Sequence, residues 1–222
     1  MLNFPKSTQY GKKIPKEKFY SKLEVSSAMK RNFVNDIDQI VWRNKLSAST
    51  INISSGSLVI EIDVLEISLK KKECNYALFE FIDKNLPNHT VFVLTYATDA
   101  QLFITYKEAI DNRVGRHKIT ANYKTDWLPQ NEIQLNIEGL NLDRVYDNFV
   151  VQIANEKLAI EAHSDLKQAI VSAQEIERLQ KEITALESKI RNETQFNIQV
   201  KLSTKLKALK KKLKKSGIDT FE

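Results

Sequence analysis

The sequence has little of several features that mark common protein classes. Its single cysteine, Cys74, cannot form an internal disulfide bond, and no apolar run approaches the ~20 residues of a membrane-spanning helix. Its five glycines are isolated, so neither a dinucleotide-binding turn nor a phosphate-binding loop can be written. The first residues also lack the apolar stretch of a secretory signal. We therefore expect a cytoplasmic protein without a membrane span that hydrolyses no nucleotide by itself.

Charge is plentiful but unevenly distributed. The 222 residues include 34 basic and 28 acidic side chains. Residues 1–45 carry 10 basic and 4 acidic residues, and residues 189–215 carry 10 and 1. Such basic ends can meet phosphate, an acidic partner or the acidic middle of another copy. The lysines expected to contact nucleic acid or a partner are Lys12, Lys13, Lys16, Lys18, Lys124, Lys201, Lys205, Lys207, Lys210, Lys211 and Lys214.

Hydrophobic spacing predicts an α+β domain over residues 23–156, after a basic N-terminal arm, residues 1–22. A helix is expected from Ser26 or Ser27 to near Asn44. A β-hairpin should follow, with strands 50–53 and 58–70, the second of them central. A helix is expected over 74–82, then strands at 90–96, 101–107, 117–127 and 133–137, and a helix over 142–153. The sheet should be largely antiparallel, with flanking helices.

The composition changes near residue 157, where aromatic residues become rare and Gln, Lys, Glu and Leu dominate. Apolar residues then follow the alternating three- and four-residue spacing of a coiled-coil seam: Ile176, Leu179, Ile183, Leu186 and Ile190. A helix over 166–191 is expected, with a second helical run capped by Ser203-Thr204. Residues 157–222, basic from 189, are therefore predicted to form a helical hairpin or coiled coil, with one kinked helix as the alternative.

Several stretches together resemble a known bacterial family. They are Phe4-Pro5-Lys6, Ile14-Pro15-Lys16, Lys18-Phe19-Tyr20, Lys45-Leu46, Thr50-Ile51-Asn52-Ile53, residues 61–70, Tyr123-Lys124-Thr125-Asp126-Trp127, and residues 189–197. In their order they resemble the family called domain of unknown function 4391, over nearly the whole chain. Members of that family appear beside helicases and DNA methyltransferases in restriction-like, phage-defence gene clusters. The resemblance implies an accessory role there and supplies no catalytic residue.

An enzymatic alternative is a nuclease that uses the acidic strand 59–70 to hold Mg²⁺ or Mn²⁺. Its candidate residues are Glu61, Asp63, Glu66 and Lys70, because carboxylates beside a lysine can hold a divalent ion and orient a water. Side chains alternate across a strand, however, so Glu61 and Asp63 should face away from Glu66 and Lys70. Outside this alternative no metal or cofactor is expected, because the three histidines lack ligand spacing.

The hypothesis that fits these patterns is a non-catalytic accessory or adaptor subunit. It would join a protein partner, such as a helicase or methyltransferase, through its helical tail, while the basic segments contact DNA or RNA. The alternatives are the divalent-metal nuclease and a purely oligomeric structural protein. Tyr123 and Trp127, on either side of Lys124, are candidates for stacking on bases, although a place in the core is the simpler interpretation.

Overall fold

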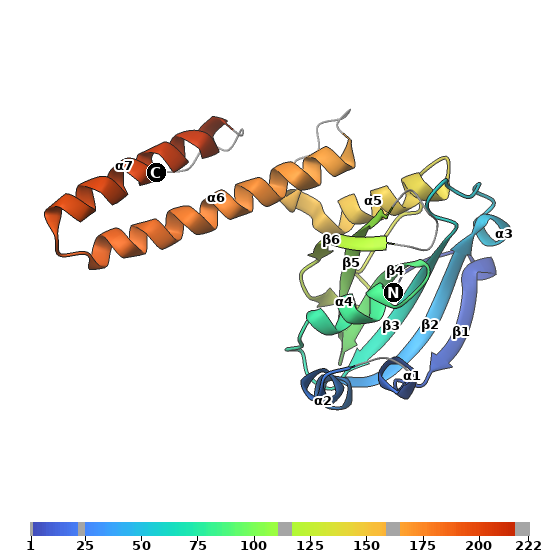
Figure 1. Ribbon diagram of the computed structural model, residues 1–222. Helices are drawn as coiled ribbons and strands as arrows, with labels where there is room; N and C mark the ends of the chain where they lie inside the picture. Colours follow the sequence, from blue (N-terminus) through green and yellow to red (C-terminus); the bar gives the residue numbers. More distant parts are fainter. Residues whose placement is uncertain (1, 22–24, 111–116, 159–164, 216–222) are drawn as a thin grey trace. The chain divides into compact units, whose positions relative to one another are not determined.

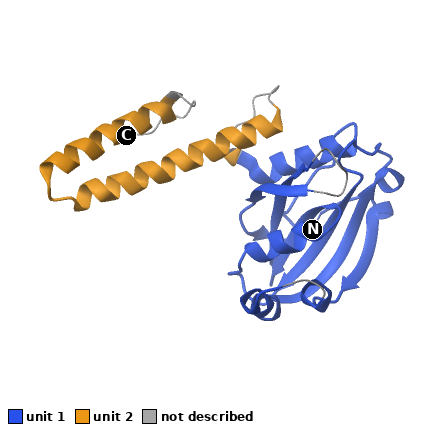
Figure 2. Ribbon diagram, in the orientation of Figure 1, with its two compact units in different colours: residues 1–155 blue, residues 156–222 orange. Residues whose placement is uncertain are grey.

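The computed structural model describes residues 2–21, 25–110, 117–158 and 165–215. The ends of the expected N-terminal arm and of the C-terminal segment, residues 1, 22 and 216–222, lie outside the described residues. The chain divides into two compact units, residues 1–155 and residues 156–222 (Figure 2).

The first unit is built on one mixed, mostly antiparallel sheet (Figure 1). Its strands are β1 (Gln9–Ile14), β2 (Ile37–Ser47), β3 (Glu61–Leu69), β4 (His89–Tyr96), β5 (Asp99–Ala109), β6 (His117–Lys124) and β7 (Leu128–Pro129). The order is β1-β2-β3-β4-β5-β6, and β7 pairs with β5. Among the described strands, only β3 and β4 pair in parallel. The crossover between them carries a helix, as parallel neighbours require.

Helices cover both faces of this sheet. They are α1 (Glu17–Tyr20), α2 (Ser27–Asp36), α3 (Ala48–Ile51), α4 (Ala77–Lys84) and α5 (Leu142–Ala154), with short 3-10 turns at Lys6–Thr8 and Asn155–Lys157. On β4, Phe92 contacts Phe79 of α4, whereas His89 contacts Tyr146 of α5. Because residues three apart on a strand point to opposite sides, α4 and α5 lie on opposite faces. The main core lies between the sheet and α1, α2 and α4.

The second unit is a helical hairpin of α6 (Leu166–Asn192) and α7 (Phe196–Lys215). Its core consists of Leu179, Ile183, Leu186, Leu209 and Leu213, with Ile176, Leu202 and Leu206 partly buried against it. The predicted hairpin is thus confirmed, and the single kinked helix is excluded. Only the start of the second helix differs. It begins at Phe196 instead of after Ser203. Just before Phe196, the side chain of Glu193 accepts hydrogen bonds from the backbone N–H groups of Thr194 and Gln195.

The expected helix over 26–44 is half wrong, because α2 ends at Asp36 and β2 begins at Ile37. Two irregularities interrupt the pairing of β2 with β3, between Ile37 and Gln39 and between Trp42 and Asn44. Such bulges break the two-residue alternation of a strand. Buried residues at Ile37 and Ile40 are therefore three apart, a spacing typical of a helix.

Two expected strands are wrong for local reasons. Residues 48–51 form the short helix α3, because Ser47 and Thr50 make a capping box at its start. Residues 133–137 form no strand, since the backbone N–H and C=O of Asn136 bond to the side chain of Gln152. The hairpin partner of the central strand β3 is therefore β2 and not residues 50–53.

The N-terminal segment, expected to be a separate arm, instead contributes a strand to the sheet. Residues Gln9–Ile14 form β1, which pairs antiparallel with β2 at the edge of the sheet. Its side chains are exposed except that of Ile14, which is why the segment shows no hydrophobic period. Within the described residues, no helix is both long enough and apolar enough to cross a membrane.

Candidate functional site

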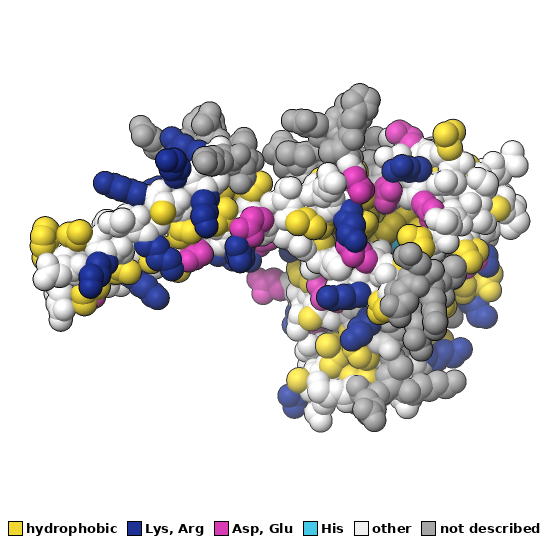
Figure 3. Space-filling model, turned by 45° about the horizontal axis from the view of Figure 1, so that its top comes forward, with side chains coloured by type: hydrophobic (Ala, Val, Ile, Leu, Met, Phe, Trp, Pro, Cys, Tyr) yellow, Lys and Arg dark blue, Asp and Glu magenta, His cyan; other side chains and the backbone are white. Residues whose placement is uncertain are grey.

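The outer face of α7 carries a row of lysines that we call the outer lysine row: Lys207, Lys211 and Lys214. These residues recur at steps of four and three and so share one face of the helix. All three are exposed, and no ion pair or hydrogen bond joins them to another described residue. Leu209 and Leu213 point the other way, into the hairpin core. Lys and Arg side chains along this unit are dark blue in Figure 3.

Other lysines of α7 form ion pairs with α6 inside the hairpin. The Nζ of Lys205 lies 3.0 Å from a carboxylate oxygen of Glu182, and that of Lys210 lies 2.8 Å from one of Glu187. Ion pairs as exposed as these contribute about 0–1 kcal/mol each. Their main effect is to reduce the repulsion among neighbouring lysines rather than to stabilise the hairpin. Lys201 is exposed near the start of α7. The structure thus separates the paired lysines from the outer lysine row.

Two large apolar side chains continue the face of the outer lysine row toward the turn of the hairpin. Phe196 is 75% exposed and Val200 is 49% exposed. They precede Lys207 by eleven and seven residues, which places them on the same side of the helix. The outer face of α7 is therefore apolar at its start and basic along its later turns.

The coiled-coil seam predicted from the sequence is occupied within the chain. Leu179, Ile183 and Leu186 are buried against leucines of α7, Ile176 packs beside them, and Ile190 is half-buried. These residues hold the two helices of the hairpin together. A partner would have to meet another face of the unit.

The candidate lysines of the first unit differ in their surroundings. Lys12, Lys13 and Lys18 are exposed, the first two on the edge strand β1. By contrast, the Nζ of Lys16 donates to the backbone oxygen of Ile37 at 2.9 Å. The Nζ of Lys124 lies 3.6 Å from the centre of the Tyr76 ring, a cation–π contact.

The aromatic candidates beside Lys124 are largely withdrawn from solvent. Tyr123 is 8% exposed, and Trp127 is half-buried against the main core with the Nζ of Lys72 5.5 Å from its ring centre. Stacking on bases needs an open ring face. The structure places these rings in or beside the core.

The four residues of the nuclease alternative are not brought together. The side-chain amide of Asn88 donates to Glu61 at 2.9 Å and to Asp63 at 3.1 Å, so these two carboxyl groups lie side by side. Glu66, on the opposite face of β3, pairs instead with Arg43. Lys70 lies beyond the end of β3, and its Nζ donates to the backbone oxygen of Val34. No group of three or more metal-ligating side chains occurs in the described ranges.

The pKa of Asp63, on this strand, is strongly raised. Burial raises its pKa to about 7, the hydrogen bond from Asn88 opposes that rise, and the neighbouring Glu61 carboxylate adds to it. Lys45, on the adjacent strand β2, forms an ion pair with Glu61 at 2.5 Å. Asp63 is only 5% exposed, so its carboxyl group is not part of the solvated surface.

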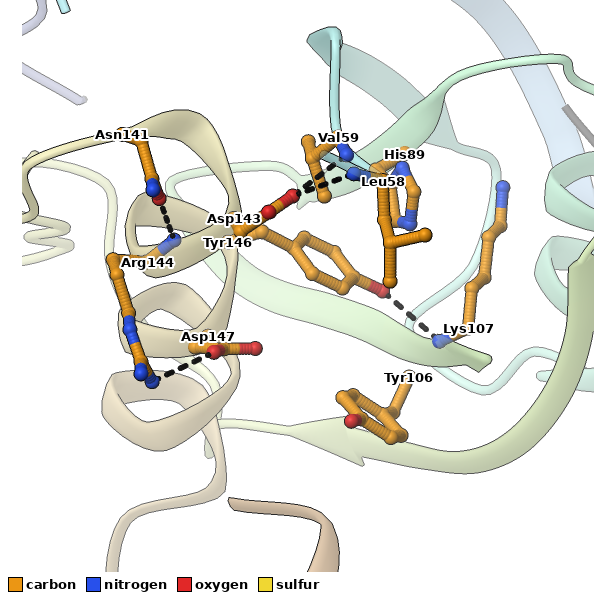
Figure 4. A pocket seen from close by; sticks show the side chains of 10 residues that line it. All are labelled: Leu58, Val59, His89, Tyr106, Lys107, Asn141, Asp143, Arg144, Tyr146 and Asp147. Atoms are coloured by element: carbon orange, nitrogen blue, oxygen red, sulfur yellow. Dashed lines mark hydrogen bonds and ion pairs between the residues drawn. The ribbon is translucent and has the colours of Figure 1, made fainter. Parts of the chain in front are cut away.

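A pocket of about 330 Å³ lies at one end of the sheet in the first unit (Figure 4). Its walls come from the segment before β3, the start of β4, the end of β5 and the first turns of α5. Leu58 and Val59 supply aliphatic surface, while Tyr106, Tyr146 and His89 supply rings. The pocket joins segments that are far apart in the sequence.

Asp143 fixes the wall formed by residues 57–59. Its carboxylate accepts hydrogen bonds from the backbone N–H groups of Ser57, Leu58 and Val59, at 2.7, 3.1 and 2.7 Å, and from the Ser57 hydroxyl at 2.9 Å. Partial burial alone would raise the pKa of Asp143, but these bonds outweigh it and lower that pKa. A Cβ on Gly56 would lie 2.1 Å from Oδ1 of Asp143, so only glycine fits there.

His89 is a buried polar side chain of the wall, with 3% of its surface exposed. Its ring is centred 4.4 Å from the Tyr146 ring and 4.6 Å from the His117 ring, edge-on to both. Burial, followed by the positive charge of Lys107, lowers the pKa of His89 to about 3. The imidazole is therefore uncharged at neutral pH.

Comparison with known families agrees with the resemblance seen in the sequence. The model of the family described as domain of unknown function (DUF4391) matches residues 2–213. The chain belongs to this family. Neither the curated proteins nor the solved structures contain a significant match to the chain. Both units lie within the matched range apart from the last residues, so sheet and hairpin are parts of one family architecture.

Sequence reasoning missed the pocket because its walls come from residues 58–59, 89, 106–107 and 141–147. No spacing within any one of these segments indicates a site. The helix predicted over 142–153 and the strands beginning near residues 90 and 101 were correct, but their packing is a property of the tertiary structure. The one local signal was a histidine directly before a strand of apolar residues.

Proposed function

We propose that this protein is a non-catalytic accessory subunit that binds nucleic acid through the outer face of α7. Its setting would be a bacterial restriction-like or phage-defence system, as the family resemblance implies. The observation that carries the proposal is the outer lysine row, three exposed lysines without a partner in the described part of the chain.

The spacing of the outer lysine row suits a phosphate backbone. At 1.5 Å per residue, its three lysines span roughly 10 Å along the helix axis. Duplex DNA carries one negative charge per about 1.7 Å of its axis, so several phosphates lie within that length. Phosphate contacts position a protein without reading bases. We therefore expect binding that depends on salt and little on sequence.

The apolar start of the same face supports the second half of the proposal, a protein partner. Aromatic side chains are enriched in protein–protein interfaces, and Phe196 is exposed in a unit whose own core is complete. A helicase or DNA methyltransferase encoded beside the gene is the partner that we propose. It would contact Phe196 and Val200, while the lysines remain available to nucleic acid.

The nucleic-acid half is tested by fluorescence anisotropy of labelled duplex and single-stranded oligonucleotides with the full-length protein. Changing the three lysines of the outer row to Gln should weaken binding about tenfold or more at low salt. A matched control changes Lys30, Lys84 and Lys118 of the first unit to Gln, which alters the net charge equally. Equal losses in both variants, or no binding by the unmodified protein, would refute this half.

The partner half is tested by co-expression with the neighbouring helicase or methyltransferase and size-exclusion chromatography. The complex should elute together with the wild-type protein and fall apart with Phe196→Ser, because a polar side chain there removes the apolar contact. A complex that survives Phe196→Ser and Val200→Ser together would show that this face does not hold the partner.

A further inference from the structure

The pocket of the first unit contains a buried histidine that lacks a hydrogen-bond partner among the described residues. His89 is 3% exposed, and it contacts His117 and Tyr146 only through its ring. Buried polar side chains are hydrogen-bonded in the large majority of cases. A neutral imidazole has one donor and one acceptor nitrogen. Both ring nitrogens of His89, the donor and the acceptor, are thus available to a molecule in the pocket.

The remaining walls are mixed, with two aliphatic and two aromatic side chains beside polar and charged ones. Leu58 and Val59 form one side, and the rings of Tyr106 and Tyr146 are centred 6.5 Å apart with 11° between their planes. Sites for small molecules are typically pockets of about 300 to 1,000 Å³. A volume of about 330 Å³ is at the lower end, which limits the ligand to a small ring system.

The charges around the pocket are already compensated. The carboxylate of Asp143 accepts four hydrogen bonds, and Arg144 forms an ion pair with Asp147 at 3.5 Å. Lys107 contributes to the wall, but its ammonium group is directed to Asp83 and its side chain is 1% exposed. The described wall therefore presents no unpaired cation to a phosphate or carboxylate. It favours a ligand without charge.

We propose that this pocket binds an uncharged planar heteroaromatic ring of nucleobase size, with His89 hydrogen-bonded to the ring's edge. Such a ring has donors and acceptors on its edge for the imidazole, and flat faces for contact with Tyr106 and Leu58. It can come from a free nucleoside or from an unstacked base of a single strand. A free nucleoside carries no phosphate, so its binding tests this pocket without a contribution from the outer lysine row.

The test uses the full-length protein and the nucleosides adenosine, guanosine, cytidine and uridine, in saturation-transfer NMR and calorimetry. At least one should bind with a dissociation constant on the order of 0.1 mM, given the ligand's size. Leu58→Trp fills the pocket and should weaken that binding about tenfold or more. Leu140→Trp is the matched control, since Leu140 is 93% exposed and lies outside the pocket, and it should bind as the wild type does.

A second variant tests the role of His89 directly. His89→Phe keeps a ring of similar size but removes both hydrogen-bonding atoms, and should weaken binding about fivefold or more. An unchanged far-ultraviolet circular dichroism spectrum and unfolding midpoint would show that the variants are folded. Binding of the same nucleoside by Leu58→Trp and wild type with equal affinity, or no binding of any nucleoside at about 5 mM, would overturn the proposal.

The source of the ring is settled with single-stranded oligonucleotides. If Leu58→Trp weakens their binding as well, the ligand is an unstacked base of a strand; if only nucleoside binding is lost, it is a free nucleoside. The triple Gln variant of the outer lysine row should bind nucleosides as the wild type does. A failure of nucleic-acid binding through α7 is thereby distinguished from a failure of the pocket.

Discussion

The Nζ of Lys107 lies 2.8 Å from Oδ1 of Asp83, and both side chains are buried, with exposed fractions of 1% and 0%. The ammonium group also donates to the backbone oxygens of Asp83 and Asn88, at 2.9 and 2.8 Å. Two of its protons therefore have backbone acceptors, and the Asp83 carboxylate supplies the opposite charge. This pair joins the crossover helix α4 to strand β5 in the core of the first unit.

Breaking this pair should destabilise the first unit strongly. Asp83→Leu leaves the Lys107 ammonium buried without its carboxylate, which typically costs about 3–5 kcal/mol. Urea unfolding followed by tryptophan fluorescence measures the loss in the first unit alone, because Trp42 and Trp127 are the chain's two tryptophans.

The exposed pair of Lys72 and Asp99 provides the control. Its side chains are 45% and 33% exposed, so Lys72→Met should destabilise the protein far less than Asp83→Leu does. The double variant Asp83→Leu/Lys107→Met should recover part of the loss, because no charge then remains buried. If Asp83→Leu costs no more than Lys72→Met, the buried pair does not stabilise the first unit more than the exposed pair does.

The raised pKa of Asp63 predicts a pH dependence of stability. In the unfolded chain this carboxyl ionises near its ordinary value of 3.8, whereas in the folded protein it remains protonated up to about pH 7. Between these values the folded state binds more protons. The free energy of unfolding should therefore fall as pH rises from about 4 to 7, by at most about 1.4 kcal/mol per pH unit.

The measurement compares wild type with Asp63→Asn by urea unfolding at several pH values. His89 acts in the opposite direction, because its pKa, lowered to about 3, removes stability as pH falls below about 6.5. Its contribution is common to both proteins and cancels in their difference. Asp63→Asn should gain stability relative to wild type between pH 5 and 7; a difference independent of pH would contradict a raised pKa.

The core of the hairpin should be sensitive to a single truncation. Leu213 is 1% exposed, and Leu213→Ala should cost about 2–4 kcal/mol through lost contacts and a residual cavity. Hydrogen exchange should then show weaker protection of amides in both α6 and α7. Val200→Ala, on the exposed face, is the control, and similar protection in both variants would mean that α7 does not pack on α6 through its leucines.

The sequence predicts the elements whose periods are regular and fails where tertiary contacts replace a period. The strands β4 and β5 and the helices α4, α5 and α6 follow from apolar spacing. Ile37 and Ile40 have the spacing of a helix because bulges interrupt β2. Residues 133–137 alternate as a strand would, but the backbone groups of Asn136 bond to the side chain of Gln152.

The candidate site could be predicted only in part. Composition identifies the basic tail, but only the hairpin shows which lysines pair with Glu182 and Glu187 and which have no partner among the described residues. The pocket around His89 could not be predicted, because four distant segments form it. Asp63 illustrates the same limit, since a charged residue in a strand is ordinarily expected at the solvated surface.

The central claim is that the outer lysine row contacts phosphates, and the salt dependence of nucleic-acid binding tests it most directly. A plot of the logarithm of the association constant against the logarithm of salt concentration has a slope of about 0.9 per neutralised duplex phosphate, or about 0.7 for single strands. Changing Lys207, Lys211 and Lys214 to Gln should reduce the slope by about 2 to 3 units. Identical slopes for this variant and wild type would contradict the account.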